Sequence, residues 1–282
     1  MQRVVRGTKV QWLAALAASV LAAGPVFAET DARVRTLIVA LRHDDPSIRE
    51  QACMSLDIIG KASIEALPAL ITTAEKDTDP NVREEATVTL GSFIEESESA
   101  LDVVIAGLKD PNLSVRLAAV RALSAPKAPP ERTALPLVEA LLRNRDADFG
   151  EAAYKCLQRY KPLPKQATPA VREALSSKEP FIRLIGTRLA SGLSALDEDT
   201  LAELKKIADD GIKSGSFQGA ELTLKALTLV ISTSSPTQEQ LAFLARMTKS
   251  QDRSERHAAL ECIVSIRNSE SAAEAINKAA VN

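Results

Sequence analysis

The amino-acid sequence predicts an all-α protein, a right-handed α-solenoid of about seven helical hairpins. Three observations predict this class. A short motif recurs about every 34 residues, apolar residues around it follow helical spacing, and Asp-Pro pairs and glycines mark helix starts and ends. A fixed period of this length is typical of stacked supersecondary units rather than of one globular core.

The motif ends in a small residue in most of its copies. The last residues of the seven copies are Ala52, Ala86, Ala119, Ala153, Gly186, Glu221 and Ala259. Their successive spacings are 34, 33, 34, 33, 35 and 38 residues, and the last two copies match the motif least well. A small side chain at this place lets the two helices of a hairpin approach closely, so a larger one would overpack them.

The first repeat shows how one hairpin is encoded. Residues 34–41 carry apolar side chains three and four positions apart, which is one stripe on a helix. Asp45 is a good cap for a second helix, Pro46 suits its first position, and Gly60 favours its end. Neither helix buries its stripe alone, so we expect the hairpins to stack into one continuous unit.

The first 28 residues have the layout of a secretory signal peptide. Three basic residues precede an apolar run over residues 12–23, a Gly-Pro pair follows, and small residues flank a cleavage site after Ala28. We therefore expect residues 29–282 to form the mature solenoid, exported to the periplasm or beyond. A retained anchor is the alternative, although the run is shorter than the ~20 residues of a membrane span.

Five arginines follow helix-capping positions at a constant distance. Each lies four residues after a residue suited to capping, which places the two on one helix face; the pairs are Asp45 and Arg49, Asp79 and Arg83, Asn112 and Arg116, Glu179 and Arg183, and Asp252 and Arg256. We expect a structural ladder, in which each arginine pairs with a cap acid of its own or the next repeat. A row of sites for phosphate or carboxylate ligands is the alternative.

Charge is distributed unevenly along the predicted mature chain. Residues 29–110 have a net charge of −9, residues 111–190 of +7 and residues 191–282 of −3. A surface of one sign accelerates association with an oppositely charged partner. We therefore expect repeats 3–5 to present a basic patch to an acidic protein partner.

The residue types needed for catalysis do not cluster in this sequence. The two histidines, His43 and His257, lie at opposite ends of the repeat array, and no metal-binding or phosphate-binding motif is present. Three cysteines about three repeats apart are too distant for a disulfide, so we expect buried thiols. Few aromatic residues and an acidic balance argue against nucleic acid. We expect no enzyme activity, no cofactor and no metal.

The pattern Asp-Pro-x-Val-Arg-x-x-Ala-x-x-x-Leu-Gly, with Ala-Leu-Pro-x-Leu ahead of it, resembles the HEAT repeat in its bacterial phycobilisome-lyase form. The resemblance covers about residues 31–268 and implies a protein-interaction scaffold that binds partners on the concave face, lined by second helices. It also leaves open a lyase or chromophore-handling role. The candidate partner-binding residues are Glu50, Glu84, Arg121, Lys155, Arg159 and Arg188.

Overall fold

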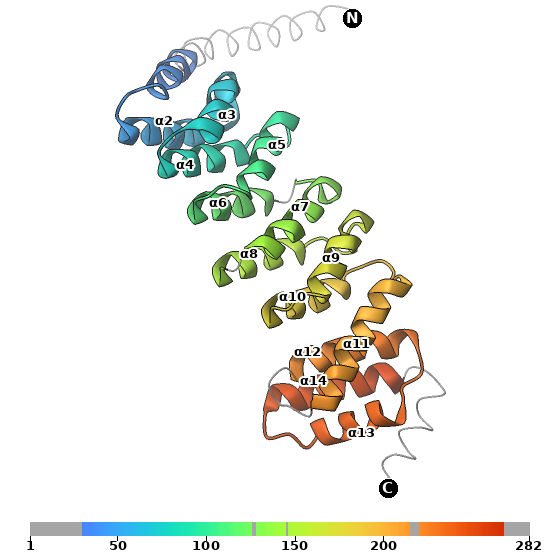
Figure 1. Cartoon of the computed structure of the whole chain (residues 1–282). Coiled ribbons are helices and arrows are strands. Elements are labelled where there is room, and N and C mark those ends of the chain that lie inside the picture. The colour runs from blue at the N-terminus through green and yellow to red at the C-terminus, as the bar shows by residue number, and fades with distance from the viewer. Residues whose placement is uncertain (1–29, 126–127, 145, 215–219, 268–282) are drawn as a thin grey trace, which may run out of the picture. The chain divides into compact units, whose positions relative to one another are not determined.

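The computed structural model describes residues 30–125, 128–144, 146–214 and 220–267 (Figure 1). Regular secondary structure in these residues is helical, with one isolated β-bridge between Leu163 and Leu193. The predicted all-α class is therefore confirmed. The predicted signal peptide and its cleavage site lie outside the described residues, as does the tail 268–282.

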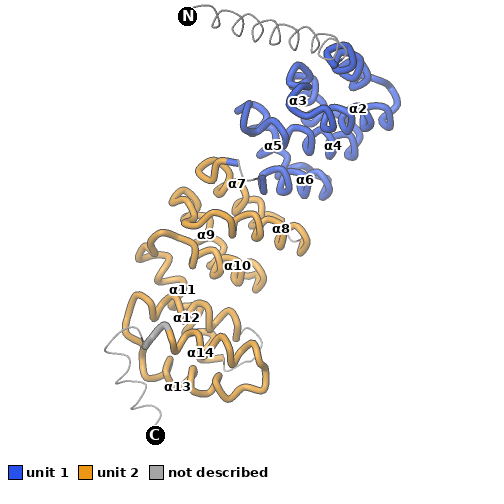
Figure 2. The backbone as a smooth tube through the Cα atoms, turned by 180° about the vertical axis from the view of Figure 1, so that it is seen from behind, with its two compact units in different colours: residues 1–128 blue, residues 129–282 orange. Residues whose placement is uncertain are grey.

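The chain divides into two compact units, residues 1–128 and residues 129–282 (Figure 2). The predicted solenoid, residues 29–282, extends over both units. The boundary falls within residues 124–130, where three prolines occur in five positions. Proline cannot donate a backbone hydrogen bond and limits helix formation, so this composition disfavours a helix that continues from one unit into the other.

Unit 1 contains three hairpins. Its helices are residues 30–40, α2 (Pro46–Ile59), the 3₁₀ helix η1 (Gly60–Ala66), α3 (Leu67–Lys76), α4 (Pro80–Gly91), α5 (Glu98–Gly107) and α6 (Leu113–Leu123). The second helices α2, α4 and α6 pack against one another in that order, and α3 and α5 pack on α4. The predicted caps Asp45 and Asp79 accept hydrogen bonds from the first-turn N–H groups of α2 and α4.

Unit 2 contains four hairpins. Its helices are α7 (Pro130–Arg143), α8 (Ala147–Leu157), η2 (Lys165–Ala167), α9 (Thr168–Leu175), α10 (Pro180–Ala190), α11 (Glu198–Ser214), α12 (Ala220–Thr233), α13 (Gln238–Met247) and α14 (Arg253–Arg267). The second helices α8, α10, α12 and α14 again pack in chain order. The two units together hold seven hairpins in the described part of the chain, as the period predicts.

Small residues face each other where the two helices of a hairpin cross. A Cβ added to Gly107 would lie 3.3 Å from Ala119 Cβ, and one added to Gly186 would lie 2.8 Å from Ala174 Cβ. Each pair is separated by 12 residues and includes the small motif residue. The geometry therefore agrees with the prediction that small residues here let the two helices of a hairpin approach closely.

The sixth repeat corrects the predicted register. Gly211 and Thr223 are also 12 residues apart, and a Cβ on Gly211 would lie 1.9 Å from Thr223 Oγ1. Thr223, and not Glu221, therefore occupies the motif position of this repeat. Glu221 is exposed in the first turn of α12. The sequence pattern failed here because threonine, rather than alanine or glycine, fills the position.

The cysteines lie on second helices, as predicted. Cys53, Cys156 and Cys262 are unpaired and buried. Burial raises the pKa of Cys53 to about 12, with nearby carboxylates such as Glu85 adding to the shift. Burial also raises the pKa of Cys262. The thiols of Cys53 and Cys262 therefore remain protonated at neutral pH, and all three cysteines pack as small apolar side chains.

We predict that Gly186→Ala destabilises the protein by about 1–3 kcal/mol, the usual cost of overpacking. The new methyl would lie 2.9 Å from the backbone nitrogen of Leu175 as well as against Ala174, so backbone would have to move. Urea unfolding measures the change. The matched control is Gly107→Ala, whose nearest neighbour is at 3.3 Å and which we expect to be neutral or stabilising. Equal midpoints for the two variants would contradict the argument.

Candidate functional site

The ladder arginines close the loops that precede the second helices. Arg49 donates from Nη1 to the carbonyl oxygens of His43 (2.8 Å) and Asp44 (3.0 Å). Arg116 contacts Asp110 O (2.8 Å) and Pro111 O (2.9 Å) in the same way. Arg83 and Arg256 make equivalent contacts to the carbonyls six and five residues before them. Each of these arginines therefore satisfies backbone acceptors of its own loop.

Two of the ladder arginines also tie one repeat to the next. Arg49 forms two hydrogen bonds of 2.7 Å to the Asp77 carboxylate, and Arg83 forms two of 2.8 and 3.0 Å to Asp110. The prediction was that a cap acid would be the partner. The structure places the partner two residues before the cap, because the cap carboxylate of Asp79 already accepts from N–H groups of α4.

The carboxylates of these two ion pairs are shielded from solvent. The side chains of Asp77 and Asp110 are 7% and 11% exposed. Burial by itself raises their pKa, but hydrogen bonds from Arg49 and Arg83 and from the cap N–H groups outweigh it, so both pKa values are lowered. Bidentate pairs of this kind are among the stronger ion pairs in proteins. They hold the three hairpins of unit 1 in register.

The ladder does not continue through every repeat. Asn144 stands two residues before the cap Asp146, at the position of Asp77 and Asp110, and accepts from that cap N–H (3.1 Å). Its amide carries no charge, and Arg116 Nε is buried without a hydrogen-bond partner. In unit 2 the guanidinium of Arg183 forms no hydrogen bond or ion pair with any described residue, and its Nε is also buried and unpartnered.

Two columns of side chains run along the second helices, two residues before and two residues after the small motif residue. We call them the −2 column and the +2 column. The −2 column contains Glu50, Glu84, Leu117, Glu151, Leu184, Glu221 and His257. The +2 column contains Met54, Val88, Arg121, Lys155, Arg188, Lys225 and Glu261. Their members are exposed or half-buried.

Unit 1 presents an acidic second-helix surface. Glu50 and Glu84 form no side-chain ion pair with the described residues, and Glu85 lies beside them. Burial raises the pKa of Glu85, the neighbouring carboxylates Glu84, Glu50 and Asp57 raise it further, and Arg121 of α6 partly offsets them. These carboxylates therefore repel one another across α2 and α4, with Arg121 at their border.

In unit 2, side chains of the −2 and +2 columns form ion pairs with each other, both within one repeat and between repeats. Lys155 lies 3.4 Å from Glu151 on α8, and Lys225 lies 3.8 Å from Glu221 on α12. Arg188 of α10 donates to Glu221 (2.6 Å) and its guanidinium lies 5.5 Å from the Tyr154 ring centre of α8. The predicted site residue Arg188 thus already joins three second helices, while Arg159 is exposed.

Sequence reasoning missed Lys225 because it aligned the sixth repeat on Glu221. With Thr223 as the motif residue, Lys225 falls in the +2 column after Arg121, Lys155 and Arg188. The basic residues of repeats 3–6 therefore share one position on their helices. The predicted patch is divided between the units, because Arg121 lies in unit 1 whereas Lys155, Arg159 and Arg188 lie in unit 2.

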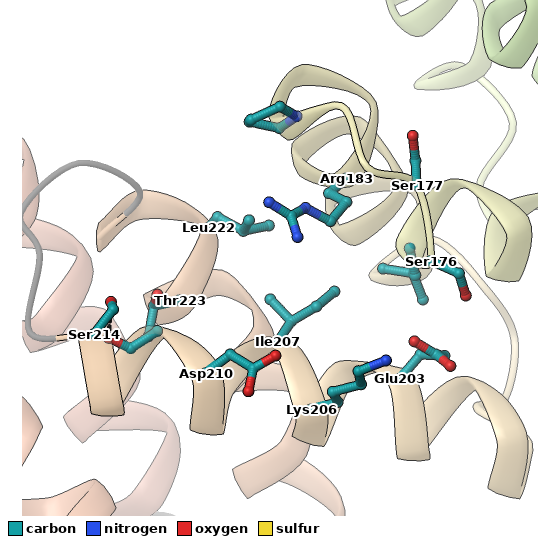
Figure 3. Close-up of a pocket in the computed structure, with 13 residues that line it drawn as sticks. Ser176, Ser177, Arg183, Glu203, Lys206, Ile207, Asp210, Ser214, Leu222 and Thr223 are labelled. Carbon is teal, nitrogen blue, oxygen red and sulfur yellow. Dashed lines mark hydrogen bonds between the residues drawn. The ribbon is translucent and has the colours of Figure 1, made fainter.

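A cleft of about 580 Å³ lies within unit 2, between the α9–α10 and α11–α12 hairpins (Figure 3). Its walls carry Arg183 from α10 and Glu203, Lys206 and Asp210 from α11. Ile207 and other apolar side chains complete the lining. The cleft holds charged groups of both signs around an apolar strip.

Groups typical of metal sites and membrane spans are absent from the described part of the chain. No three His, Cys, Asp or Glu side chains gather there as metal ligands would. None of its helices is long and apolar enough to cross a bilayer. His43 and His257 belong to different units and make local contacts, His43 with the Asp45 N–H and His257 with Glu261.

We predict that Asp110→Asn lowers the stability of unit 1 by about 2 kcal/mol at pH 7, as expected for hydrogen bonds to a charged group. The folded pKa of Asp110 is lowered, so its contribution is complete above the unfolded pKa of about 3.9 and is lost as pH falls through the folded value. The urea unfolding midpoints of Asp110→Asn and of the wild type, compared at pH 7 and pH 3, measure this contribution. The difference from wild type should shrink at pH 3, and the exposed control Asp44→Asn should show none at either pH.

Comparisons with known proteins agree with this architecture. The archaeal HEAT-like repeats protein from Thermococcus onnurineus NA1 is 20% identical and has a TM-score of 0.54, over 87% of this chain and 97% of that chain. An engineered protein of known structure is 16% identical and has a TM-score of 0.50, over 88% and 71%. At these identities the likeness shows the fold alone. No curated protein matches the sequence.

The sequence itself matches the family of HEAT repeats over residues 8–91, 67–158 and 102–188. These matches together span more than half of the chain. The phycobilisome-lyase form of the repeat is not specified by this match. The repeated hairpins, their small crossing residues and the family match lead to one conclusion: the chain belongs to the HEAT-repeat family.

Proposed function

We propose that the protein is an exported, non-catalytic scaffold that binds protein partners through its second-helix columns. The fold supports an interaction role, because HEAT repeats generally serve protein binding. The observation that carries the proposal is the pair of columns, where charged side chains recur at one position on successive second helices. Stacked repeats of this kind provide extended binding surfaces without needing a deep pocket.

The charges of the columns favour different partner surfaces in the two units. In unit 1, Glu50, Glu84 and Glu85 lie together, so the partner surface facing α2 and α4 would be basic. The +2 column is basic from Arg121 to Lys225, so an acidic partner surface would face these helices. Exposed charges of this kind act mainly on the association rate and on partner choice. Met54, 46% exposed, adds apolar contact area beside the acidic residues.

Charge reversal tests the basic side of this surface. We expect a column variant, which combines Arg121→Glu and Lys155→Glu of the +2 column with Arg159→Glu at the exposed turn after α8, to reduce capture of specific partners from envelope extracts. The physical reason is repulsion of an acidic partner surface, and the same capture should weaken with added salt, since exposed charges are screened. Affinity capture followed by quantitative mass spectrometry measures the loss.

The control variant reverses three exposed lysines outside the columns, Lys76, Lys205 and Lys249. It changes the net charge by the same amount and should retain the partners that the column variant loses. Unfolding midpoints of both variants confirm that they are folded. Equal capture by the two variants would remove these residues from the binding surface.

Export is the second part of the proposal and has its own test. We expect intact-mass analysis of the protein from the periplasmic or secreted fraction to find a chain that begins at Glu29. The reason is the charged, apolar and small-residue succession of residues 1–28. A full-length chain recovered with membranes would show a retained anchor instead, and a full-length chain in the cytoplasm would contradict export.

A further inference from the structure

Four charged side chains line the cleft between the α9–α10 and α11–α12 hairpins. They are Arg183, Glu203, Lys206 and Asp210, and none of these side chains forms a hydrogen bond or an ion pair with a described residue. Several other basic side chains of unit 2 are paired with acids, as Arg188 is with Glu221. The lining of this cavity of about 580 Å³ instead brings together four charged side chains without a protein partner.

Arg183 is the ladder arginine that lacks the ladder's contacts. Arg49, Arg83, Arg116 and Arg256 all donate to carbonyls of their own loops, whereas Arg183 does not. Its Nε is buried without a partner. The Nη groups that bind loop carbonyls in the other four arginines have no acceptor in Arg183, so they are available to an acceptor from outside the protein.

Asp210 stands at the sequence distance of a ladder partner. It follows Arg183 by 27 residues, as Asp110 follows Arg83. Asp110, however, precedes a helix cap, whereas Asp210 lies near the end of the 17-residue helix α11. Figure 3 shows Arg183 extending from α10 toward Leu222 of α12, with Ile207 and Asp210 of α11 drawn below it. Arg183 and Asp210 therefore form no ion pair, and both of these charged side chains line the cleft.

The α11–α12 side of the cleft is fixed by close helix packing. Gly211 approaches Thr223 so closely that a Cβ there would lie 1.9 Å from the threonine oxygen. Next to this contact, Ile207 and Leu222 provide apolar lining, and Pro180 adds to it at the start of α10. The cleft therefore places Arg183 of α10 opposite a helix, α11, that carries Glu203, Lys206 and Asp210, with an apolar strip in the same lining.

We propose that this cleft binds a compact zwitterion, an amino acid or short peptide that carries both a free carboxylate and a free ammonium group. Arg183 receives the carboxylate, for which its planar guanidinium is well suited, and Lys206 adds positive charge. Asp210 and Glu203 receive the ammonium group. An apolar side chain of the ligand contacts Ile207 and Leu222. The cavity volume lies within the usual range of small-ligand sites.

This site is separate from the second-helix columns, so its test does not depend on the proposed scaffold role. The probes are L-leucine and the dipeptide Leu-Leu, titrated into the full mature chain and followed by calorimetry or NMR shifts. N-acetyl-leucine lacks the ammonium group and leucinamide lacks the carboxylate. We expect both derivatives to bind about tenfold or more weakly than leucine, since each loses a charged hydrogen bond. Comparing the affinities of leucine and Leu-Leu distinguishes a site for a free amino acid from a site for a peptide.

Two substitutions assign the contacts. Arg183→Gln should weaken leucine binding about tenfold or more while leaving the unfolding midpoint unchanged, because the guanidinium forms no internal hydrogen bond or ion pair. Asp210→Asn should weaken leucine but leave N-acetyl-leucine unaffected. The matched control is Arg116→Gln, the equivalent arginine with two loop contacts, which should lower the midpoint and leave binding intact.

Either of two results overturns the proposal. One is no binding of leucine or Leu-Leu at about 10 mM, a concentration above the range expected for a specific ligand of this size. The other is wild-type affinity in Arg183→Gln. A midpoint for Arg183→Gln as low as that of Arg116→Gln would show instead that Arg183 has the ordinary ladder role.

Discussion

Each hairpin can bury its apolar stripe only against its own partner helix and the adjacent hairpins, and the rest of the structure depends on this constraint. Because the two helices must come close, small residues occupy their crossing points, as in the pairs Gly107 with Ala119 and Gly186 with Ala174. The same packing turns one side of every second helix outward. The −2 and +2 columns are therefore a consequence of stacking, and the charges on them can vary without disturbing the core.

The arginine ladder adds specificity to this packing. Hydrophobic burial alone is not directional, whereas the double hydrogen bonds of Arg49 to Asp77 and of Arg83 to Asp110 require one register between neighbouring repeats. These rungs lie in unit 1. In the next copy of the pattern an amide, Asn144, replaces the carboxylate, and in unit 2 the potential rung between Arg183 and Asp210 is open. The arginine position that forms ion pairs in unit 1 therefore contributes an unpaired charge, Arg183, to a cleft in unit 2.

The fold was predictable from sequence because period, capping residues and apolar stripes are local properties that repeat. Asp45 and Asp79 cap the helices that the pattern assigns to them, and the cysteines are buried where their helix positions predict. The candidate site was predicted in part. The +2 positions of Arg121, Lys155 and Arg188 were found, but Lys225 was missed because Thr223 conceals the sixth motif.

The sequence by itself determined the helical hairpins, their number and the side of each helix that faces its neighbours, because these follow from spacing along the chain. Tertiary structure decided which charges are satisfied. Arg49 pairs with Asp77 and not with the cap Asp79. Arg188 contacts Glu221 and Tyr154, whereas Arg183 has no acceptor. Such pairings depend on distances of a few ångströms between separate helices, which residue order does not specify.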